Sequence, residues 1–276
     1  MQGIKVSRPR ILRSNADSPL TLDQIRSVAP AVFQESAHPR TSESYAYIPT
    51  IRVLELMLEK GFHIHEVAQA RPYKRDNDPY VKHMIRMRYP VKAKKVGEVV
   101  PEIVLINAHD GTARYYLYGG LYRFICSNGL VVGDTFTKLV VAHRGGDITR
   151  NRVLEGSYEI VDKQFPAILS AKEQMEQVIL DVKQQIALAD TALGLRYPNT
   201  VPPFKAEQLL TVRRQEDEYE DLWHVMNRIQ ENVMEGGFES RSFMFQRRTH
   251  IRPVERVTNR VAINRGIWDA AMKMLA

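Results

Sequence analysis

The sequence predicts an α+β protein in which an antiparallel sheet of three to five strands, flanked by helices, is followed by a mainly helical C-terminal half. Between residues 60 and 145, short apolar runs alternate with Gly, Asp and Asn turn signals. After residue 165, apolar residues recur at helical spacing over long stretches. We expect three parts, which are an N-terminal arm (1–45), an α+β core (46–160) and a helical region with a basic C-terminal segment (161–276).

Two helices near the N-terminus are predicted from the residues that begin and end them. In the arm, Leu22 to Val28 is a candidate helix with Thr21 as its N-cap. A second amphipathic helix follows Pro49, with Thr50 as its expected N-cap. It ends at Gly61, where a left-handed residue is needed.

The core then continues mainly as strands. Asp110-Gly111 favours a tight hairpin, because this pair readily supplies positive φ. The spacing from Leu121 to Ser127 predicts a short helix closed by Asn128-Gly129. The predicted strands are residues 62–70, 80–89, 102–107, 114–118 and 135–143.

Three helices are predicted in the C-terminal half. The first spans Ala167 to Leu193, between Pro166 and Gly194. The second spans residues 216–235, ends at Gly236-Gly237, and carries an apolar stripe typical of a packing face. The third runs through Trp268 near the C-terminus.

Composition excludes several classes of protein. With 44% hydrophobic and 26% charged residues, the 276-residue chain is typical of a globular protein. No apolar run approaches the roughly 20 residues that span a bilayer, and the basic N-terminus lacks the apolar core of a signal peptide. A single cysteine, Cys126, excludes an intramolecular disulfide and favours a cytoplasmic protein.

Charge is unevenly distributed along the chain. Residues 1–150 carry a net charge of +8, residues 151–237 carry −6, and residues 238–276 carry +5. Such asymmetry can serve contacts between subunits as well as ligand binding.

The strongest local signal is the basic stretch from Arg71 to Lys95, which has nine basic residues and two acids. On a strand, Lys82, Arg86 and Arg88 would share one face, opposite an apolar face. This row predicts polyanion binding, although an exposed edge strand protected by its cations would look the same. The candidate nucleic-acid-binding residues are Lys74, Arg75, Lys82, Arg86, Arg88, Lys92, Lys94, Lys95, Arg123, Arg247 and Arg248.

Aromatic residues are interleaved with these cations. We expect one or two of them to be exposed platforms on which bases stack, and the others to pack internally. They are Tyr73, Tyr80, Tyr89, Tyr115, Tyr116, Tyr118 and Tyr122.

Signs of catalysis or cofactor binding are weak. His63, His65 and Glu66, with His83 as a further ligand, form the single close group of metal-ligand types, and we expect no metal site there. A metal-dependent nuclease would need converging carboxylates, for which the candidates are Asp76, Asp78, Glu102 and Asp110. The sequence contains neither a phosphate-binding loop nor a nucleophile elbow, so we expect no cofactor and no catalytic residue.

Three stretches resemble a family of uncharacterised proteins encoded by phages, prophages and conjugative plasmids, often labelled phage/plasmid-like protein. The stretches are Ser44-Tyr45-Ala46-Tyr47-Ile48-Pro49-Thr50, Gly120-Leu121-Tyr122-Arg123-Phe124-Ile125-Cys126-Ser127-Asn128-Gly129-Leu130 and Asn259-Arg260-Val261-Ala262-Ile263-Asn264-Arg265-Gly266-Ile267-Trp268. The resemblance covers most of the chain and implies an origin in a mobile genetic element.

The order of a helix, three antiparallel strands and another helix is also similar, at the level of the fold, to ring-forming single-strand annealing proteins. That similarity implies a groove along one DNA backbone. The residues that correspond in type are Lys82, Arg86, Arg88, Lys92 and Arg123.

We therefore expect a cytoplasmic, non-catalytic nucleic-acid-binding protein of mobile-element origin. The specific expectation is single-stranded DNA binding or annealing in recombination by a homo-oligomer without membrane contact. A metal-dependent nuclease and a protein that blocks a host factor are the alternatives.

Overall fold

The computed structural model describes most of the chain. The described residues are 10–14, 18–42, 45, 47–71, 75–90, 99–123, 128–131, 139–141, 146–237, 239–241 and 248–275. Within them, the side chains of residues 75–77, 128–131, 139–141, 146–151, 239–241 and 248–249 are not described.

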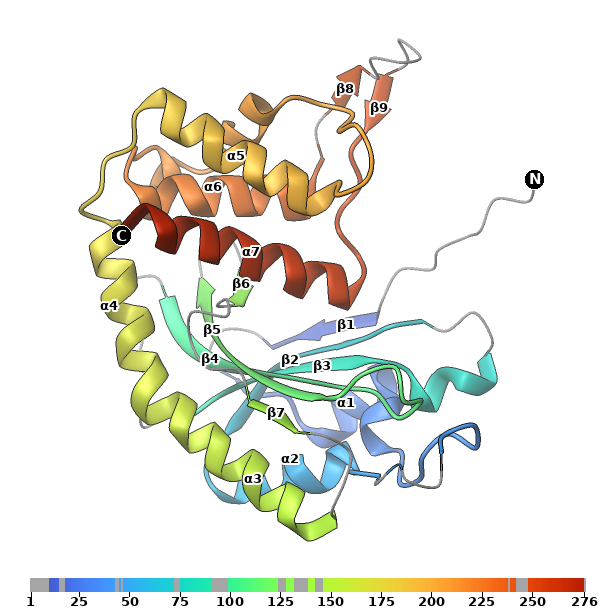
Figure 1. Ribbon diagram of the computed structural model, residues 1–276. Coiled ribbons are helices and arrows are strands. Elements are labelled where there is room, and N and C mark those ends of the chain that lie inside the picture. The colour runs from blue at the N-terminus through green and yellow to red at the C-terminus, as the bar shows by residue number, and fades with distance from the viewer. Residues whose placement is uncertain are drawn as a thin grey trace. The chain divides into compact units, whose positions relative to one another are not determined.

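The described residues form two compact units (Figure 1). The first comprises residues 1–129 and 137–166, and the second comprises residues 130–136 and 167–276. The strands are β1 (Arg10–Arg13), β2 (His63–Gln69), β3 (His83–Arg88), β4 (Val99–Asn107), β5 (Tyr115–Arg123), β6 (Asn128–Val131), β7 (Leu139–Val141), β8 (Glu239–Arg241) and β9 (Arg248–His250). The α-helices are α1 (Leu22–Val28), α2 (Thr50–Glu59), α3 (Gly146–Glu159), α4 (Phe165–Met175), α5 (Val182–Arg196), α6 (Leu222–Glu235) and α7 (Val257–Leu275).

The main sheet has the order β1-β2-β3-β4-β5-β6, and β7 pairs with β5. Strands β1 to β5 are antiparallel to their neighbours, and so is β7 to β5. The predicted α+β class with its antiparallel sheet is confirmed. Gly111 has the expected positive φ of 77°, but the connection between β4 and β5 spans residues 108–114 and is longer than the expected tight hairpin.

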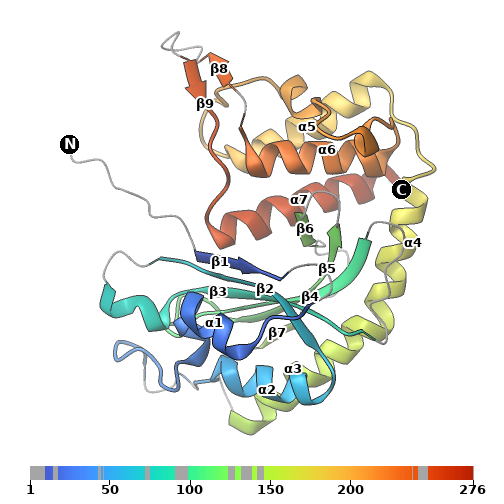
Figure 2. The same cartoon turned by 180° about the vertical axis from the view of Figure 1, so that it is seen from behind.

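One face of the sheet packs against α1, α2 and α3 (Figure 2). Leu54 and Met57 of α2 are fully buried, as are Ile85 of β3 and Leu105 of β4. These side chains alternate with those of the opposite face, as the period of a strand requires. The core of the first unit therefore lies between this sheet face and the three helices.

Two local expectations in the first unit are wrong. Thr50 is the first residue of α2 and makes no capping bond, because its hydroxyl points into the core and bonds to His83. Leu121 begins no helix, because β5 continues through Arg123 in register with β4. A short apolar run cannot by itself distinguish a helix from a buried strand.

Helix α3 continues through a π-helical turn, Ile160–Gln164, into α4. In this turn the N–H of Phe165 donates to the carbonyl of Ile160, five residues back. Pro166 follows at once, has no N–H to donate, and would crowd the preceding turn of a regular helix. The wider turn accommodates the proline ring.

The predicted single helix from Ala167 to Leu193 is instead two helices, α4 and α5. Helix α5 begins at a capping box in which Asp181 accepts from the N–H of Gln184 at 2.8 Å, and the side chain of Gln184 accepts from the N–H of Asp181 at 2.8 Å. Gly194 lies inside α5 and does not end it. The Asp-x-x-Gln spacing at residues 181–184 is the sequence signal of this helix start.

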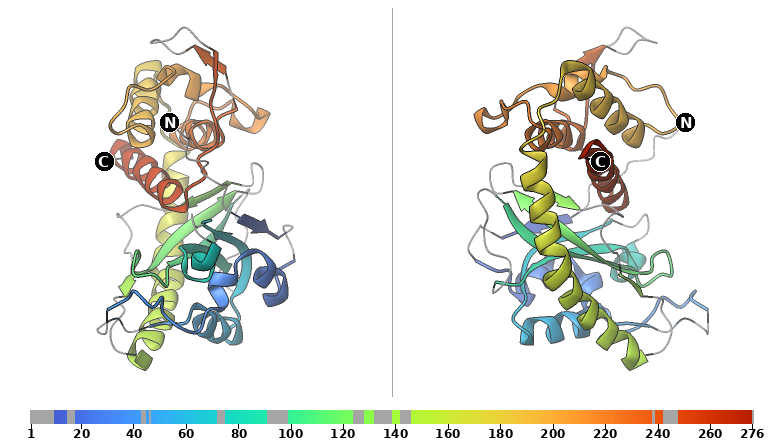
Figure 3. Two further views of the ribbon diagram at one scale, coloured as in Figure 1. Left: turned by 90° about the vertical axis from the view of Figure 1, so that its right-hand side faces the viewer. Right: turned by 60° about the vertical axis from the view of Figure 1, so that its left-hand side comes forward.

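In the second unit, α5, α6 and α7 pack on one another (Figure 3, in yellow, orange and red). A Cβ added to Gly266 of α7 would lie 2.5 Å from the side chain of Leu195 in α5, so glycine permits a close approach of these two helices. Trp223 of α6 and Trp268 of α7 are buried. Across the described helices, none is long and apolar enough to cross a bilayer.

Candidate nucleic-acid interface

The predicted row of exposed cations is largely buried. Lys82 is partly exposed and precedes β3, whereas Arg86 and Arg88 are 2% and 7% exposed. Strand β3 is also an interior strand between β2 and β4, not an exposed edge. The expectation of a solvent-facing row is therefore wrong for these two arginines, and so is the alternative of a protected edge.

Glu102 of β4 compensates the charges of both buried arginines. One carboxylate oxygen accepts from Arg86 Nη1 at 2.9 Å, and the other accepts from Arg88 Nε at 2.8 Å. The guanidinium of Arg88 also lies 4.7 Å from the ring centroid of Tyr122. A buried guanidinium is costly unless it is paired, and here one carboxylate pairs with two of them.

The same face carries a line of alternating charges across four strands. Arg13 of β1, Glu66 of β2 and Arg86 of β3 are directly opposite one another, and Arg13 Nε donates to Glu66 at 3.0 Å. Glu102 and Arg88 extend the line into β4 and back to β3. Opposite charges on neighbouring strands stabilise a sheet, so this face is internally neutralised to a large extent.

A β-bulge in β2 makes this line possible. The register shifts between Ile64, which pairs with Met87, and Glu66, which pairs with Arg86. In a regular strand these two side chains would share a face. The extra residue, His65, lets Ile64 enter the core while Glu66 faces the arginines.

His65 itself bonds to Ser14 Oγ through Nδ1 at 2.9 Å. Burial, together with the positive charges of Arg88 and His63, lowers the pKa of His65 to about 4. His63 is exposed, whereas His65 is buried. Within the described part of the chain, no three His, Cys, Asp or Glu side chains gather as a metal site would require.

The other predicted cations fall in two groups. The first is Arg123 alone, which is buried at the end of β5. The second contains the cations whose side chains are not described. Of these, Arg75 and Arg248 lie in described backbone, and the others lie wholly outside the described residues, namely Lys74, Lys92, Lys94, Lys95 and Arg247.

Three of the four carboxylates proposed for a nuclease have described side chains, and these three do not gather at one site. Asp78 pairs with Arg10 and accepts from Gln69 at 3.2 Å. Glu102 is held by its two arginines, and Asp110 accepts from the N–H of Thr112 at 3.0 Å in the β4–β5 turn. The side chain of Asp76 is outside the described set.

The tyrosines near the cations are more buried than expected. Tyr115 and Tyr118 are 0% and 6% exposed, and Tyr116 stacks on Tyr118 with ring centroids 5.9 Å apart. Partly buried are Tyr80, Tyr89, Tyr116 and Tyr122, while Tyr73 lies outside the described residues. None of the six with described side chains is a fully exposed platform.

A buried polar network in the first unit was not predicted. Thr50 Oγ1 accepts from Asn107 Nδ2 at 3.0 Å and lies 2.8 Å from His83 Nε2 and 3.5 Å from His109 Nε2. His109 Nε2 in turn lies 2.9 Å from the carbonyl of Ala31. Burial lowers the pKa of His83 to about 4, so this histidine is neutral at pH 7. The network joins α2 to β3, β4 and the arm, and its full burial fits a structural role.

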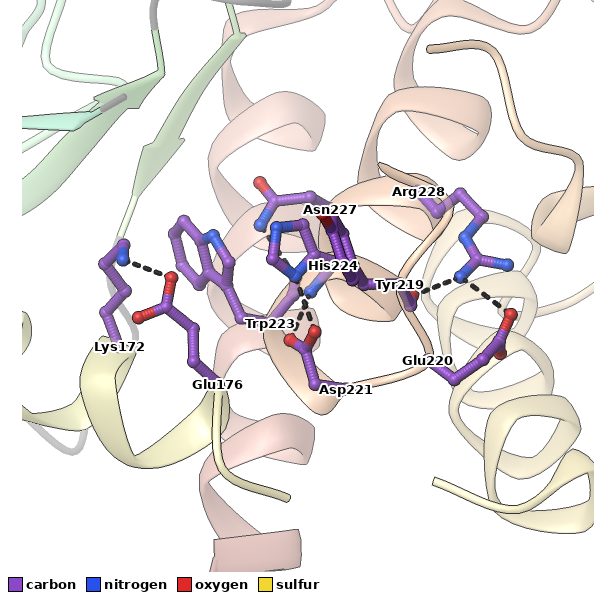
Figure 4. A network of polar contacts seen from close by, with 9 residues as sticks. All are labelled: Lys172, Glu176, Tyr219, Glu220, Asp221, Trp223, His224, Asn227 and Arg228. Atoms are coloured by element: carbon purple, nitrogen blue, oxygen red, sulfur yellow. Dashed lines mark hydrogen bonds and ion pairs between the residues drawn. The ribbon is translucent and has the colours of Figure 1, made fainter. Parts of the chain in front are cut away.

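The second unit has a polar cluster at the start of α6 (Figure 4). Asp221 caps the helix by accepting from the N–H of His224 at 3.1 Å, and its other oxygen lies 2.6 Å from His224 Nδ1. Burial acts to raise the pKa of Asp221, but the hydrogen bonds and charge of His224 outweigh it and lower the pKa. Arg228 donates to the carbonyl of Tyr219 at 2.6 Å.

Comparison with known proteins identifies the family. The family described as "Domain of unknown function (DUF932)" matches residues 37–268. The chain belongs to this family. It is similar to the UPF0380 proteins YfjQ and YafZ of Escherichia coli (strain K12), with 37% identity to each over 94% of this chain and 93% of each relative. No solved structure matches. The DUF932 match covers β2 to β5 and the polar cluster at the start of α6, whereas Arg13 of β1 and Ala31 precede it.

Proposed function

We propose that this DUF932 protein binds nucleic acid through the basic segments that flank β3, with single-stranded DNA as the preferred ligand. The observation that carries the proposal is the net positive charge of residues 71–95, a stretch with seven more basic than acidic residues. A concentrated positive charge on a chain is the electrostatic signature of polyanion binding.

The ion pairs of β3 indicate which cations of this stretch are available to bind phosphates. Arg86 and Arg88 are neutralised in part by Glu102, so they are poor candidates for binding phosphates. The remaining basic residues of the stretch precede or follow the strand. They are Arg71, Lys74, Arg75, Lys82, Lys92, Lys94 and Lys95.

These two groups belong to segments at opposite ends of β3. The strand has six residues, which corresponds to about 17 Å at roughly 3.3 Å per residue. A ligand that contacts cations on both sides of the strand needs several negative charges. A nucleic-acid strand supplies one at each phosphate, whereas a single phosphate group does not.

The role in annealing and recombination is the finer part of the proposal. It is supported by the resemblance to proteins of mobile elements and by the order of helix, antiparallel strands and helix. Rapid pairing of two complementary oligonucleotides in the presence of the protein is the expected activity.

The test is fluorescence anisotropy with labelled single- and double-stranded oligonucleotides over a range of salt. Affinity should fall steeply as salt rises, because bound phosphates release counterions. The variant K92A/K94A/K95A should lower the slope of log K against log salt by about 2, from roughly 0.7 per phosphate contact. The matched control is K60A/K183A/K273A, which removes three exposed lysines elsewhere.

Two results would overturn the proposal. One is the absence of binding at low salt, and the other is an equal loss of affinity in the control variant. Magnesium-dependent cleavage of the oligonucleotide would replace binding with the nuclease alternative.

A further inference from the structure

The two ends of helix α6 carry exposed charges of opposite sign. At its start, Asp181, Glu216 and Glu218 are exposed. Glu216 and Glu218 form no ion pair with a described residue. Among the cations nearby, Lys183 is exposed, whereas Arg228 is buried and lies 3.5 Å from Glu220.

The same end exposes three large apolar side chains. Ile179, Val182 and Tyr219 are 70%, 68% and 64% exposed. Their segments are held together by backbone bonds, from Leu180 N to the carbonyl of Glu220 at 2.9 Å and from Leu222 N to the carbonyl of Val178 at 2.8 Å. Figure 4 shows Tyr219 beside His224 at the beginning of the helix. We call this surface the acidic end, and its residues are Ile179, Asp181, Val182, Glu216, Glu218 and Tyr219.

The other end of α6 is basic. Arg213 donates to Asn232 at 2.5 Å and to the carbonyl of Gly236, so its charge lies at the helix C-terminus. The chain returns to this end through bonds from Gly237 N to the carbonyl of Ile251 at 2.8 Å and from Val254 N to that of Met234 at 2.7 Å.

That return places two further arginines nearby. Arg252 and Arg256 are exposed and have no ion pair with a described residue. Among the described side chains, the acids in this region are Glu231, which is buried and pairs with Arg214, and Glu235 and Glu255, both partly exposed. We call this surface the basic end, and its residues are Arg213, Arg252 and Arg256.

The helix dipole accounts for the signs of these charges, because acids are favourable at a helix N-terminus and cations at its C-terminus. It does not account for three exposed apolar side chains beside the acids, since such patches usually mark an interaction surface. Helix α6 has 14 residues, so the two ends are about 20 Å apart and cannot neutralise each other within one copy.

We propose that copies of this chain associate head to tail, with the acidic end of one second unit against the basic end of the next. The partner is a second copy because the acidic end and the basic end have complementary charges. The exposed apolar side chains of the acidic end would be buried in the contact. Because the two contacting surfaces differ, the association continues into a ring or an open chain and does not stop at a symmetric dimer.

The test is the weight-average mass of the full chain, measured by analytical ultracentrifugation over a range of protein concentration. Species larger than the 31.7 kDa monomer are expected at about 50 mM salt, and a shift toward the monomer is expected at about 1 M, where screening extends over only about 3 Å. The variant I179S/V182S/Y219S should be monomeric throughout. V201S is the matched control, because Val201 is 84% exposed in the same unit.

A charge exchange makes the test specific for the head-to-tail arrangement. E216R/E218R and R252E/R256E should each be monomeric alone, and an equimolar mixture should associate again. The proposal is overturned if the wild type is monomeric at every concentration and salt, if V201S disrupts assembly as strongly as the triple variant, or if the mixture stays monomeric. A circular dichroism spectrum confirms that each variant is folded.

Discussion

Replacement of Glu102 by Gln should destabilise the first unit by about 3–5 kcal/mol, the usual cost of removing one partner from a buried ion pair. The side chains of Arg86, Arg88 and Glu102 are 3%, 8% and 1% exposed. The substitution keeps the shape of the side chain but leaves two buried guanidiniums without the negative charge that compensates them.

Urea denaturation followed by circular dichroism measures this effect. With a slope of about 1–3 kcal/mol per molar urea, the midpoint should fall by at least about 1 M. Glu55→Gln is the control, because Glu55 forms an exposed pair with Arg52 at 3.1 Å and should contribute only about 0.3–0.5 kcal/mol.

A triple variant that removes all three charges distinguishes the effect of the unpaired charge from that of side-chain packing. Arg86→Met, Arg88→Met and Glu102→Leu together replace the ion pairs with apolar groups of similar size, and such replacements are often neutral or stabilising. The triple variant should therefore regain most of the lost stability. If Glu102→Gln destabilises no more than Glu55→Gln, the assignment of Glu102 as the compensating charge is refuted.

Three further predictions concern the polar networks. Thr50→Val should lower the free energy of unfolding by about 1–3 kcal/mol, because it leaves buried donors unsatisfied, and Thr50→Ser should restore most of it in the same urea assay. Burial lowers the pKa of His83 to about 4 in the folded protein, whereas the pKa of a histidine in the unfolded chain is about 6.5. As the pH falls below about 6.5, the unfolded chain therefore takes up a proton at this residue before the folded protein does. The contribution of His83 to stability should thus be retained above about pH 6.5 and fall by up to about 1.4 kcal/mol per pH unit toward pH 4. His65, with its pKa also lowered to about 4, adds a slope of the same sign, so His83→Gln should reduce the slope without abolishing it, and a variant that keeps the full slope would contradict this assignment. Asp221→Ala should cost about 0.5–2 kcal/mol by removing the N-cap of α6, whereas Asp221→Asn should lose less in thermal denaturation, and equal losses would argue against capping.

The sequence predicts which side chains of β3 share a face. It does not predict which residues of the neighbouring strands contact them. Arg86 and Arg88 do share a face, and Ile85 and Met87 do enter the core. Their charge partner, Glu102, comes from the neighbouring strand β4. Pairing between strands is non-local, so periodicity within one strand carries no information about it.

Local backbone irregularities were the other limit. Nothing in the alternation of residues 62–70 marks His65 as a bulge, yet this residue decides which face Glu66 occupies. By contrast, the capping of α1 by Thr21 depends on neighbouring residues alone and is confirmed. The separation of α4 from α5 was equally local, because the Asp181 capping box is visible in the sequence.

The positions of Trp223 and Trp268 have a spectroscopic consequence. They are the protein's two tryptophans, and both are buried in the second unit. Intrinsic tryptophan emission therefore reports solvent access to that unit alone, whereas far-ultraviolet ellipticity reports both units. Coincident midpoints from the two signals would identify one cooperative folding unit, and separate midpoints would give each unit its own free energy of unfolding without any added label.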